Sequence, residues 1–372
     1  MNILFFVPRF HTNQIDIAKA LIQKGHKVLF HVRNKSIIED YTVIKPWVVP
    51  KSKLSIFLCK IFKVQANSLR FNFPSFYNYF NVLKQEKIQL IVIRDPTSIA
   101  PILVSCIARL NRIPIVFYTQ MVINKRYSPL RYLLYKTMIR LFKAAWFSPV
   151  LGPVDRSLNP KIKHLFYIPF PILSKKIPNK LYNSDQVFNF LMIGKFQPRK
   201  NHILLLKSLH FLQAAYRFRI VLVGECTTTE HLSVYKEVLN FIKDHNMGEI
   251  VEIFINVKPS QMHVHFNNAD VFVLPSSNEP ASISILEAMS YGLPVIVSDD
   301  CGNKDYVKDA ETGFHFQSGS EWDLTNKIEE LLSSIDTLTN FRQSSYIRIK
   351  NNYSYEEFSA KFNDMVMKRF KL

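Results

Sequence analysis

The chain has 372 residues, 48% of them hydrophobic and 21% charged, which is enough apolar material for about two domains and excludes a disordered chain. Its four cysteines are far apart and form no CxxC pair, which argues against a disulfide framework or a thiolate zinc site and favours a reducing cytosol. The formal net charge of +19 is uneven: residues 1–180 hold 29 Lys and Arg against 6 Asp and Glu, whereas residues 181–372 hold 19 against 23.

The basic first half predicts a polyanionic partner, either nucleic acid or an anionic membrane surface, with a merely solvated basic surface as the alternative. The first apolar run is too short for a signal peptide, and no window of 18 uncharged apolar residues occurs. Neither a secretory leader nor a transmembrane helix is therefore expected, and residues 3–7 are predicted to form a buried first strand.

Apolar, β-branched segments alternate with helix-like segments along both halves of the chain. Strands are predicted at 2–7, 27–32, 89–93, 115–118, 189–193, 219–223, 251–255, 271–274 and 294–297. This alternation is typical of parallel sheets covered on both faces, so we expect two doubly wound α/β domains, over 1–180 and 181–350. A proline-bearing, polar stretch near 169–187 marks the boundary, and a C-terminal helix over 351–372 could pack back on the first domain.

The segment GKFQPRKN, residues 194–201, lies between an expected strand and an expected helix. Ligands of open α/β sheets bind just past the carboxyl ends of strands, and the glycine would allow close approach of the backbone. Its three cations lie beside a helix N-terminus, whose N–H groups favour anions. The segment therefore predicts a phosphate or diphosphate site, with a solvated charged loop as the alternative.

The segment EPASISILEAM, residues 279–289, carries two carboxylates around a second expected helix start. Glu287 shares a helix face with Ile283 and Ser284, and helical side chains lean toward the N-terminus. An ionised carboxylate can accept hydrogen bonds from two hydroxyls, such as those of a ribose or a sugar diol. The alternative is that Glu279 merely caps the helix and Glu287 lies on an exposed face.

Together these segments resemble the nucleotide-sugar domain of GT-B glycosyltransferases, specifically glycosyltransferase family 4. That family carries two glutamates separated by seven residues, as Glu279 and Glu287 are, and the flanking VFVLPSSNEPASISILEAMSYGLPVIVSDDCGN follows its pattern. GKFQPRKN resembles the family's Gly-Arg…Lys-Gly loop, with Lys195 and Lys200 at the basic positions. The resemblance is strong over about 188–320 and weak over 1–180.

The resemblance implies two Rossmann-like domains that face a central cleft. It also implies transfer of a sugar, with retained anomeric configuration, from a UDP or GDP sugar to a glycan or lipid-linked acceptor, without a metal or further cofactor. The implied setting is the synthesis of lipopolysaccharide, O-antigen or capsule. The implied catalytic residues are Lys195, Lys200 and Glu279, and the implied donor-binding residues are Gly194, Arg199, Val257, Ser282, Ile283, Ser284 and Glu287.

The first half departs from the family pattern at two places. Many members have a glycine pair after the first strand, where this chain has PRFHTNQ, and a histidine after the strand equivalent to 115–118, where this chain has Thr119 and Gln120. Asn13 and Gln120 are the candidate acceptor-binding or catalytic residues at these places. No carboxylate or third histidine lies close in sequence to His263 and His265, so no metal site is expected.

The segment KSKLSIFLCKIFK, residues 51–63, has apolar residues at helical spacing between Lys51, Lys53, Lys60 and Lys63. Such a basic amphipathic helix is typical of proteins that lie on anionic lipid. We therefore expect a cytoplasmic protein attached peripherally to the inner face of the membrane, with a solvated helix as the alternative.

Two other functions remain as alternatives. A nucleic-acid-binding protein would use the basic first half, although no nucleic-acid-binding motif occurs in the sequence. A nucleotide-sugar epimerase on the same architecture would turn over the donor without an acceptor.

Overall fold

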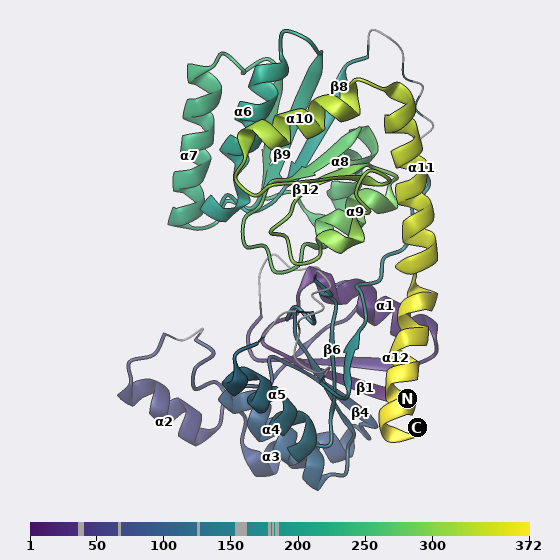
Figure 1. The fold of residues 1–372 in the computed structure, drawn as a ribbon. Coiled ribbons are helices and arrows are strands. Elements are labelled where there is room, and N and C mark those ends of the chain that lie inside the picture. Colours follow the sequence, from purple (N-terminus) through teal and green to yellow (C-terminus); the bar gives the residue numbers. More distant parts are fainter. Residues whose placement is uncertain are drawn as a thin grey trace. The chain divides into compact units, whose positions relative to one another are not determined.

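The computed structural model describes residues 1–35, 41–65, 68–124, 127–152, 162–177, 180, 182 and 186–372. It divides into two compact units (Figure 1). Unit 1 comprises Met1–Pro171 and Tyr355–Leu372, and unit 2 comprises Ile172–Ser354. This division comes earlier in the chain than the boundary expected near residue 180. Pro178 and residues 183–185, which mark that boundary in the sequence, lie outside the described residues.

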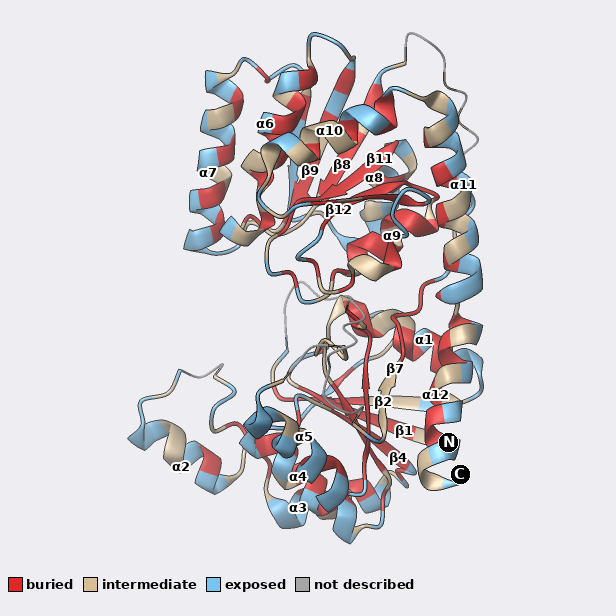
Figure 2. Ribbon diagram, viewed as in Figure 1, coloured by how far each residue is buried: buried red, intermediate tan, exposed pale blue. Residues whose placement is uncertain are grey.

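Unit 1 contains a parallel sheet of seven strands in the order β3-β2-β1-β4-β5-β6-β7. Its strands are β1 Asn2–Val7, β2 Lys27–Val32, β3 Trp47–Val48, β4 Leu90–Arg94, β5 Ile115–Tyr118, β6 Ala145–Ser148 and β7 Leu165–Tyr167. Its helices are α1 Ile15–Gln23, α2 Lys53–Ile61, α3 Phe76–Gln85, α4 Ile99–Leu110, α5 Pro129–Leu141 and α12 Tyr355–Phe370. The central strands are continuous apolar runs because helices cover both of their faces, and Figure 2 shows them buried.

The C-terminal helix α12 packs on unit 1. The Tyr355 hydroxyl donates a hydrogen bond to Asp16 of α1, and the Ser359 hydroxyl donates to the Ala20 carbonyl at 3.1 Å. Phe362 meets Phe147 of β6 edge to face, with ring centroids 6.2 Å apart. The helix therefore completes the unit that the first part of the chain begins.

Unit 2 contains a parallel sheet of six strands in the order β10-β9-β8-β11-β12-β13. Its strands are β8 Phe188–Ile193, β9 Phe218–Gly224, β10 Val251–Ile255, β11 Val271–Leu274, β12 Val295–Ser298 and β13 Gly313–Phe316. Its helices are α6 His202–Leu212, α7 Thr229–Asp244, α8 Met262–Asn268, α9 Ile283–Ser290, α10 Glu321–Leu332 and α11 Ile335–Asn352. The expected fold of two doubly wound parallel sheets is confirmed.

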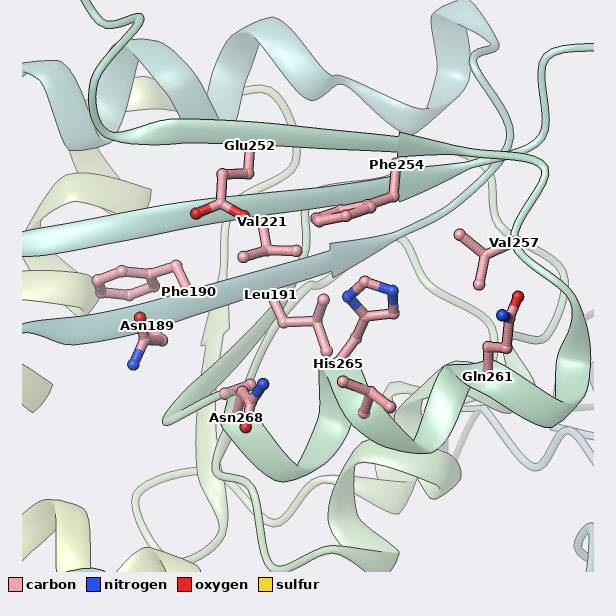
Figure 3. Close-up of a pocket in the computed structure, with 12 residues that line it drawn as sticks. Asn189, Phe190, Leu191, Val221, Glu252, Phe254, Val257, Gln261, His265 and Asn268 are labelled. Carbon is pink, nitrogen blue, oxygen red and sulfur yellow. The ribbon is translucent and has the colours of Figure 1, made fainter.

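In unit 2 the two faces of the sheet are covered unequally. Side chains of α6, α7, α10 and α11 pack with one face to form the main core of the unit. The short helix α8 covers only part of the other face over β8 to β10 (Figure 3). Within the described residues every helix is too short or too polar to span a bilayer.

Candidate functional site

The lysine-bearing loop leaves the carboxyl end of β8 with Gly194 held against β9, because its N–H donates to the Val223 carbonyl at 2.9 Å. The Lys200 side chain crosses directly over this glycine. A Cβ atom at residue 194 would lie 3.1 Å from Cδ of Lys200. The glycine predicted for close approach of the backbone therefore makes room for one of the predicted cations.

Asn201 joins this loop to the loop that follows β11. Its backbone is in the left-handed region (φ 54°), which asparagine tolerates better than most residues. Its side-chain amide donates to the Pro275 carbonyl at 2.9 Å and to the Ser277 hydroxyl at 2.7 Å. The Ser277 N–H in turn donates to the Arg199 carbonyl at 2.8 Å. The two motifs that are 80 residues apart in sequence are thus fastened together.

Glu279 receives two cations from the lysine-bearing loop. The Lys200 ammonium lies 2.6 Å from Oε2 of Glu279, and the Arg199 guanidinium binds the same oxygen. Both Lys200 and Glu279 are only 7% exposed, so this ion pair is shielded from solvent. Removing one partner of such a pair leaves an uncompensated buried charge, and the pair therefore fixes the position of both side chains.

Lys195 points to a different carboxylate. Its ammonium lies 2.7 Å from Oε2 of Glu225, which follows β9, and the Thr227 hydroxyl donates to the other oxygen at 2.8 Å. Burial alone raises the pKa of Glu225, but these hydrogen bonds outweigh burial and hold the pKa below its usual value. The structure therefore brings Lys200 and Arg199 together on Glu279 and leaves Lys195 on Glu225.

The first turn of α9 is held by Asn303. Its side-chain oxygen accepts from the Ser282 N–H, and its amide donates to the Ser282 carbonyl, both at 2.8 Å. The Ser282 and Ser284 hydroxyls lie 2.7 Å apart. No side chain caps the helix at Ser282, so the N–H groups around Ile283 keep the preference of a helix N-terminus for anions.

Glu287 lies half-buried on α9, one helical turn before Tyr291. Burial and then the charge of Glu287 raise the pKa of Tyr291.

His202 is a residue of this site that the sequence analysis missed. It is the first residue of α6, almost fully buried, and its ring stacks on Phe196 with centroids 4.7 Å apart. Burial and the neighbouring charge of Lys200 lower its pKa to about 3, so the imidazole is neutral at physiological pH. The neutral ring therefore packs beside the cationic loop without adding a further positive charge. In the sequence, the only feature that could have pointed to His202 is its position directly after Asn201, the last residue of the GKFQPRKN segment.

Val257 lies on the turn after β10, at one end of a hollow of about 380 Å³ between β8–β10 and α8 (Figure 3). Asn256 fixes this turn, since its N–H donates to the Gly224 carbonyl and its side-chain oxygen accepts from the Cys226 N–H, each at 2.9 Å. Phe254 and His265 meet within the hollow with ring centroids 4.6 Å apart. Val257 is therefore held beside the carboxyl ends of β9 and β10.

In unit 1, polar side chains follow four adjacent strands of the sheet at their carboxyl ends. Asn13 follows β1, Arg33 follows β2, Asp95 follows β4 and Gln120 follows β5. Asn13 is 7% exposed and Arg33 is 5% exposed. Oδ1 of Asn13, Nε2 of Gln14 and Nε of Arg33 have no hydrogen-bond partner among the described residues. Buried polar atoms without partners are costly, and they are suited to a polar ligand.

Arg33 and Asp95 belong to this edge, although the sequence analysis did not single them out. Burial lowers the pKa of Arg33 to about 10, and the charge of Asp95 opposes that shift. Burial raises the pKa of Asp95, while the charges of Arg94 and Arg33 lower it. Gln120 lies beside the Tyr118 hydroxyl, whose pKa burial raises to about 12. The signal in the sequence for Arg33 and Asp95 was a charged residue directly after an apolar strand, β2 and β4 respectively.

Helix α2 carries the lysines of the predicted membrane segment and stands out from the sheet at the lower left of Figure 1. The Ser52 hydroxyl caps it by accepting from the Ser55 N–H at 3.0 Å. Lys53, Lys60 and Lys63 are exposed and Lys51 is half-buried. Apolar side chains that are between 45% and 58% exposed accompany them: Leu54, Ile56, Phe57, Ile61 and Phe62. The predicted helix is confirmed, and Figure 2 shows that most of it is exposed.

The potential metal ligands do not gather. In the part of the chain that the structure describes, no three His, Cys, Asp or Glu side chains lie together. Nδ1 of His263 donates to the Ser260 carbonyl at 2.8 Å, and His265 packs on Phe254.

Part of the chain is similar to a known protein family. Residues 174–348 match the family model described as "Glycosyl transferases group 1". The chain is 26% identical over 193 residues to a GDP-Man:Man(3)GlcNAc(2)-PP-Dol alpha-1,2-mannosyltransferase of Dictyostelium discoideum, and 26% identical over 186 residues to a lipopolysaccharide 1,2-N-acetylglucosaminetransferase of Salmonella typhimurium. These alignments cover 49% and 48% of this chain, and they span only 36% and 48% of the two relatives.

Two solved structures resemble the whole chain. A glycosyltransferase of Rickettsia africae has a TM-score of 0.74 at 15% identity, covering 100% of this chain and 99% of that one. Anabaena HepE, solved in complex with UDP and glucose, has a TM-score of 0.71 at 14% identity, covering 99% and 100%. This likeness shows that the two parallel-sheet units form a GT-B fold.

Proposed function

We propose that the chain is a glycosyltransferase that moves a sugar from a nucleotide-diphosphate sugar to a glycan or lipid-linked acceptor in the synthesis of cell-surface polysaccharide, with retained anomeric configuration. The observation that carries this proposal is the junction of two motifs at Glu279, where Arg199 and Lys200 share one carboxylate oxygen beside an uncapped helix N-terminus. The family match over unit 2 supports it.

The donor diphosphate would be bound by the cations of the lysine-bearing loop and by the first-turn N–H groups of α9. When the bond from the anomeric carbon to the diphosphate oxygen breaks, negative charge develops on the diphosphate, and fixed cations there lower the barrier. Lys195, Arg199 and Lys200 supply that charge, so the proposed reaction uses neither a metal ion nor another cofactor. Arg199 is the most exposed of the three and is free to turn from Glu279 to a phosphate.

The remaining donor contacts follow from the same elements. Glu279, fixed by Lys200, would accept from hydroxyls of the transferred sugar, and Glu287 would accept from the ribose. The backbone around Ser282 to Ser284 would face the phosphates, and Gly194 would allow them to approach. Val257 would lie against the base of UDP or GDP.

The acceptor would bind at the polar edge of unit 1. A sugar offers hydroxyls that both donate and accept, which matches the oxygen of Asn13 and the N–H groups of Gln14 and Arg33 that have no partner among the described residues. The acceptor hydroxyl would form the new bond on the face that the diphosphate leaves, and its proton would pass to the departing diphosphate oxygen. Gln120 would orient the acceptor, since an amide cannot serve as a general base at neutral pH.

Helix α2 would attach the protein to an anionic membrane. Its exposed phenylalanine, leucine and isoleucine side chains would enter the interface, and its lysines would meet lipid phosphates at about 1 kcal/mol each. We propose accordingly a cytoplasmic protein bound to the inner face of the membrane. Co-sedimentation with vesicles tests this part separately: Phe57→Asp should weaken binding to anionic vesicles, and equal binding of the wild type to neutral and anionic vesicles would refute it.

The donor site is tested by thermal shift with UDP, GDP, ADP and CMP. A ligand that binds only the folded protein raises its melting temperature, so one of the diphosphates should stabilise the wild type. Glu287→Ala should abolish the shift, whereas Glu249→Ala, an exposed glutamate after α7, should leave it intact. No shift with any of the four nucleotides would contradict the proposed donor site.

A further inference from the structure

A hollow of about 320 Å³ at the amino edge of the unit 1 sheet is lined by basic side chains from three segments of the chain. Arg109 and Arg112 come from the end of α4, Lys143 follows α5, and Arg369 lies near the end of α12. Among the described residues, no carboxylate side chain lines the hollow. In the sequence, every charged residue between Asp95 and Asp155 is basic. Part of the excess positive charge of residues 1–180 is therefore concentrated at this hollow.

Two of these cations occupy strained backbone positions. Arg112 and Lys143 lie two residues past the ends of α4 and α5, in the left-handed region, with φ of 59° and 48°. Helix ends usually give this position to glycine or asparagine. In unit 2 the matching positions after α7 and α9 do so, with Asn246 and Gly292. A cation there is also favoured by the helix dipole, so these residues define a site only because they meet in one hollow with Arg369.

Arg369 is held in place by the wall of the hollow. Its Nε donates to the Lys143 and Ala144 carbonyls at 3.2 and 3.0 Å, and its NH1 donates to Nε2 of His164 at 3.0 Å. The pKa of His164 is lowered by burial and then by the charges of Arg369 and Lys163, which reflects the positive potential of this edge. A guanidinium fixed in this way is preorganised for an anion.

We propose that this hollow binds the phosphate group of an anionic lipid headgroup. A phosphate presents several acceptor oxygens at once, and a fixed guanidinium with three further cations offers matching donors. Exposed apolar side chains favour a lipid as the carrier: Leu372 lines the hollow, Leu110 and Leu141 each adjoin a lining residue in the chain, and all three are more than half exposed. A free phosphate ester offers the same acceptor oxygens, but it has no apolar chains to contact these leucines. The inference rests on the proposed membrane attachment and is independent of the transfer reaction.

Vesicle binding of the full chain tests the site with a matched pair of charge reversals. Arg112→Glu/Lys143→Glu removes two cations from the hollow, and Lys24→Glu/Lys27→Glu removes two exposed cations at another part of the same unit. The hollow variant should bind phosphatidylglycerol-containing vesicles at least about tenfold more weakly than the matched variant. Equal losses in the two variants would show a general charge effect and overturn the proposal.

Titration without a membrane separates the hollow from α2 and lipid from free phosphate. Short-chain, water-soluble phosphatidylglycerol should bind the wild type and the Phe57→Asp variant, and it should not bind the hollow variant. Absence of binding to the wild type, or binding of inorganic phosphate alone, would overturn the lipid assignment. An unchanged shift by the stabilising nucleoside diphosphate shows that the variant is folded and that the proposed donor site is intact. If Arg112→Glu/Lys143→Glu fails to fold, Arg112→Gln/Lys143→Gln replaces it, with the same outcomes.

Discussion

The two units share one architecture, but they differ in how far the polar side chains at the carboxyl ends of their strands are paired. In unit 2 the charged side chains past the strands are paired, Lys200 and Arg199 with Glu279 and Lys195 with Glu225, whereas Oγ of Ser276 and Nδ1 of His202 have no partner among the described residues. In unit 1 the corresponding edge keeps buried polar atoms of Asn13, Gln14 and Arg33 without partners among the described residues. A paired edge holds its groups in fixed positions, whereas an unpaired edge keeps hydrogen-bonding capacity for a ligand.

This difference suits two kinds of ligand. A diphosphate needs fixed, concentrated positive charge, which unit 2 stabilises with its own carboxylates in the absence of the ligand. A sugar acceptor needs neutral donors and acceptors at several positions, which unit 1 supplies. Variants that unpair unit 2 should therefore reduce stability, and variants at the open edge of unit 1 should change binding with little effect on stability.

The largest effect is expected for Glu279→Ala. It leaves the buried Lys200 without its partner and should lower the free energy of unfolding by about 3–5 kcal/mol. Urea denaturation followed by far-UV circular dichroism measures the change. Glu311→Ala removes an exposed carboxylate paired with Lys308 and should cost less than about 1 kcal/mol. Similar urea midpoints for the two variants would mean that the pair at Glu279 is not buried.

A smaller effect, dependent on pH, is expected at His202. Its pKa falls from the usual 6.5 to about 3 on folding, so the unfolded chain takes up the proton first as the pH drops. Stability should therefore be complete above about pH 6.5 and should decline by up to about 1.4 kcal/mol per pH unit from there toward pH 3. His202→Phe, which keeps the stack on Phe196, should show a shallower decline. Parallel urea midpoints of wild type and variant between pH 7 and about pH 4.5 would exclude the predicted shift.

The smallest effect is expected at the open edge of unit 1. Asn13→Ala removes one hydrogen-bonding oxygen and should raise the acceptor KM by a factor of about 2–10, which corresponds to one hydrogen bond. The dissociation constant of the nucleoside diphosphate should stay unchanged. Gln85→Ala, an exposed amide at the end of α3, should alter neither quantity. A change in nucleotide affinity with no change in acceptor KM would assign Asn13 to the donor instead.

The sequence predicts the alternation of strands and helices, and the place of each motif beside a helix start, because both depend on local patterns. Continuous apolar runs identify central strands such as β1 and β8. The sequence analysis did not identify β3, β6, β7 and β13, which have two to four residues each, and β3, β7 and β13 lie at the edges of their sheets. The pairing of Lys195 with Glu225 could not be predicted, since it depends on where β9 ends in space. Arg33 and His202 escaped notice because burial, and not residue type, gives each of them its importance.

The central claim is that the cationic loop of unit 2 binds the diphosphate of the donor. The affinity of the protein for nucleotides tests this claim most directly. Isothermal titration should compare the stabilising nucleoside diphosphate with its monophosphate in the wild type and in Lys195→Gln/Arg199→Gln, which spares the buried Lys200. Charge-assisted hydrogen bonds to the second phosphate should make the wild type prefer the diphosphate by at least about tenfold, and the variant should lose most of that preference. A variant that keeps the full preference of the wild type would contradict the account.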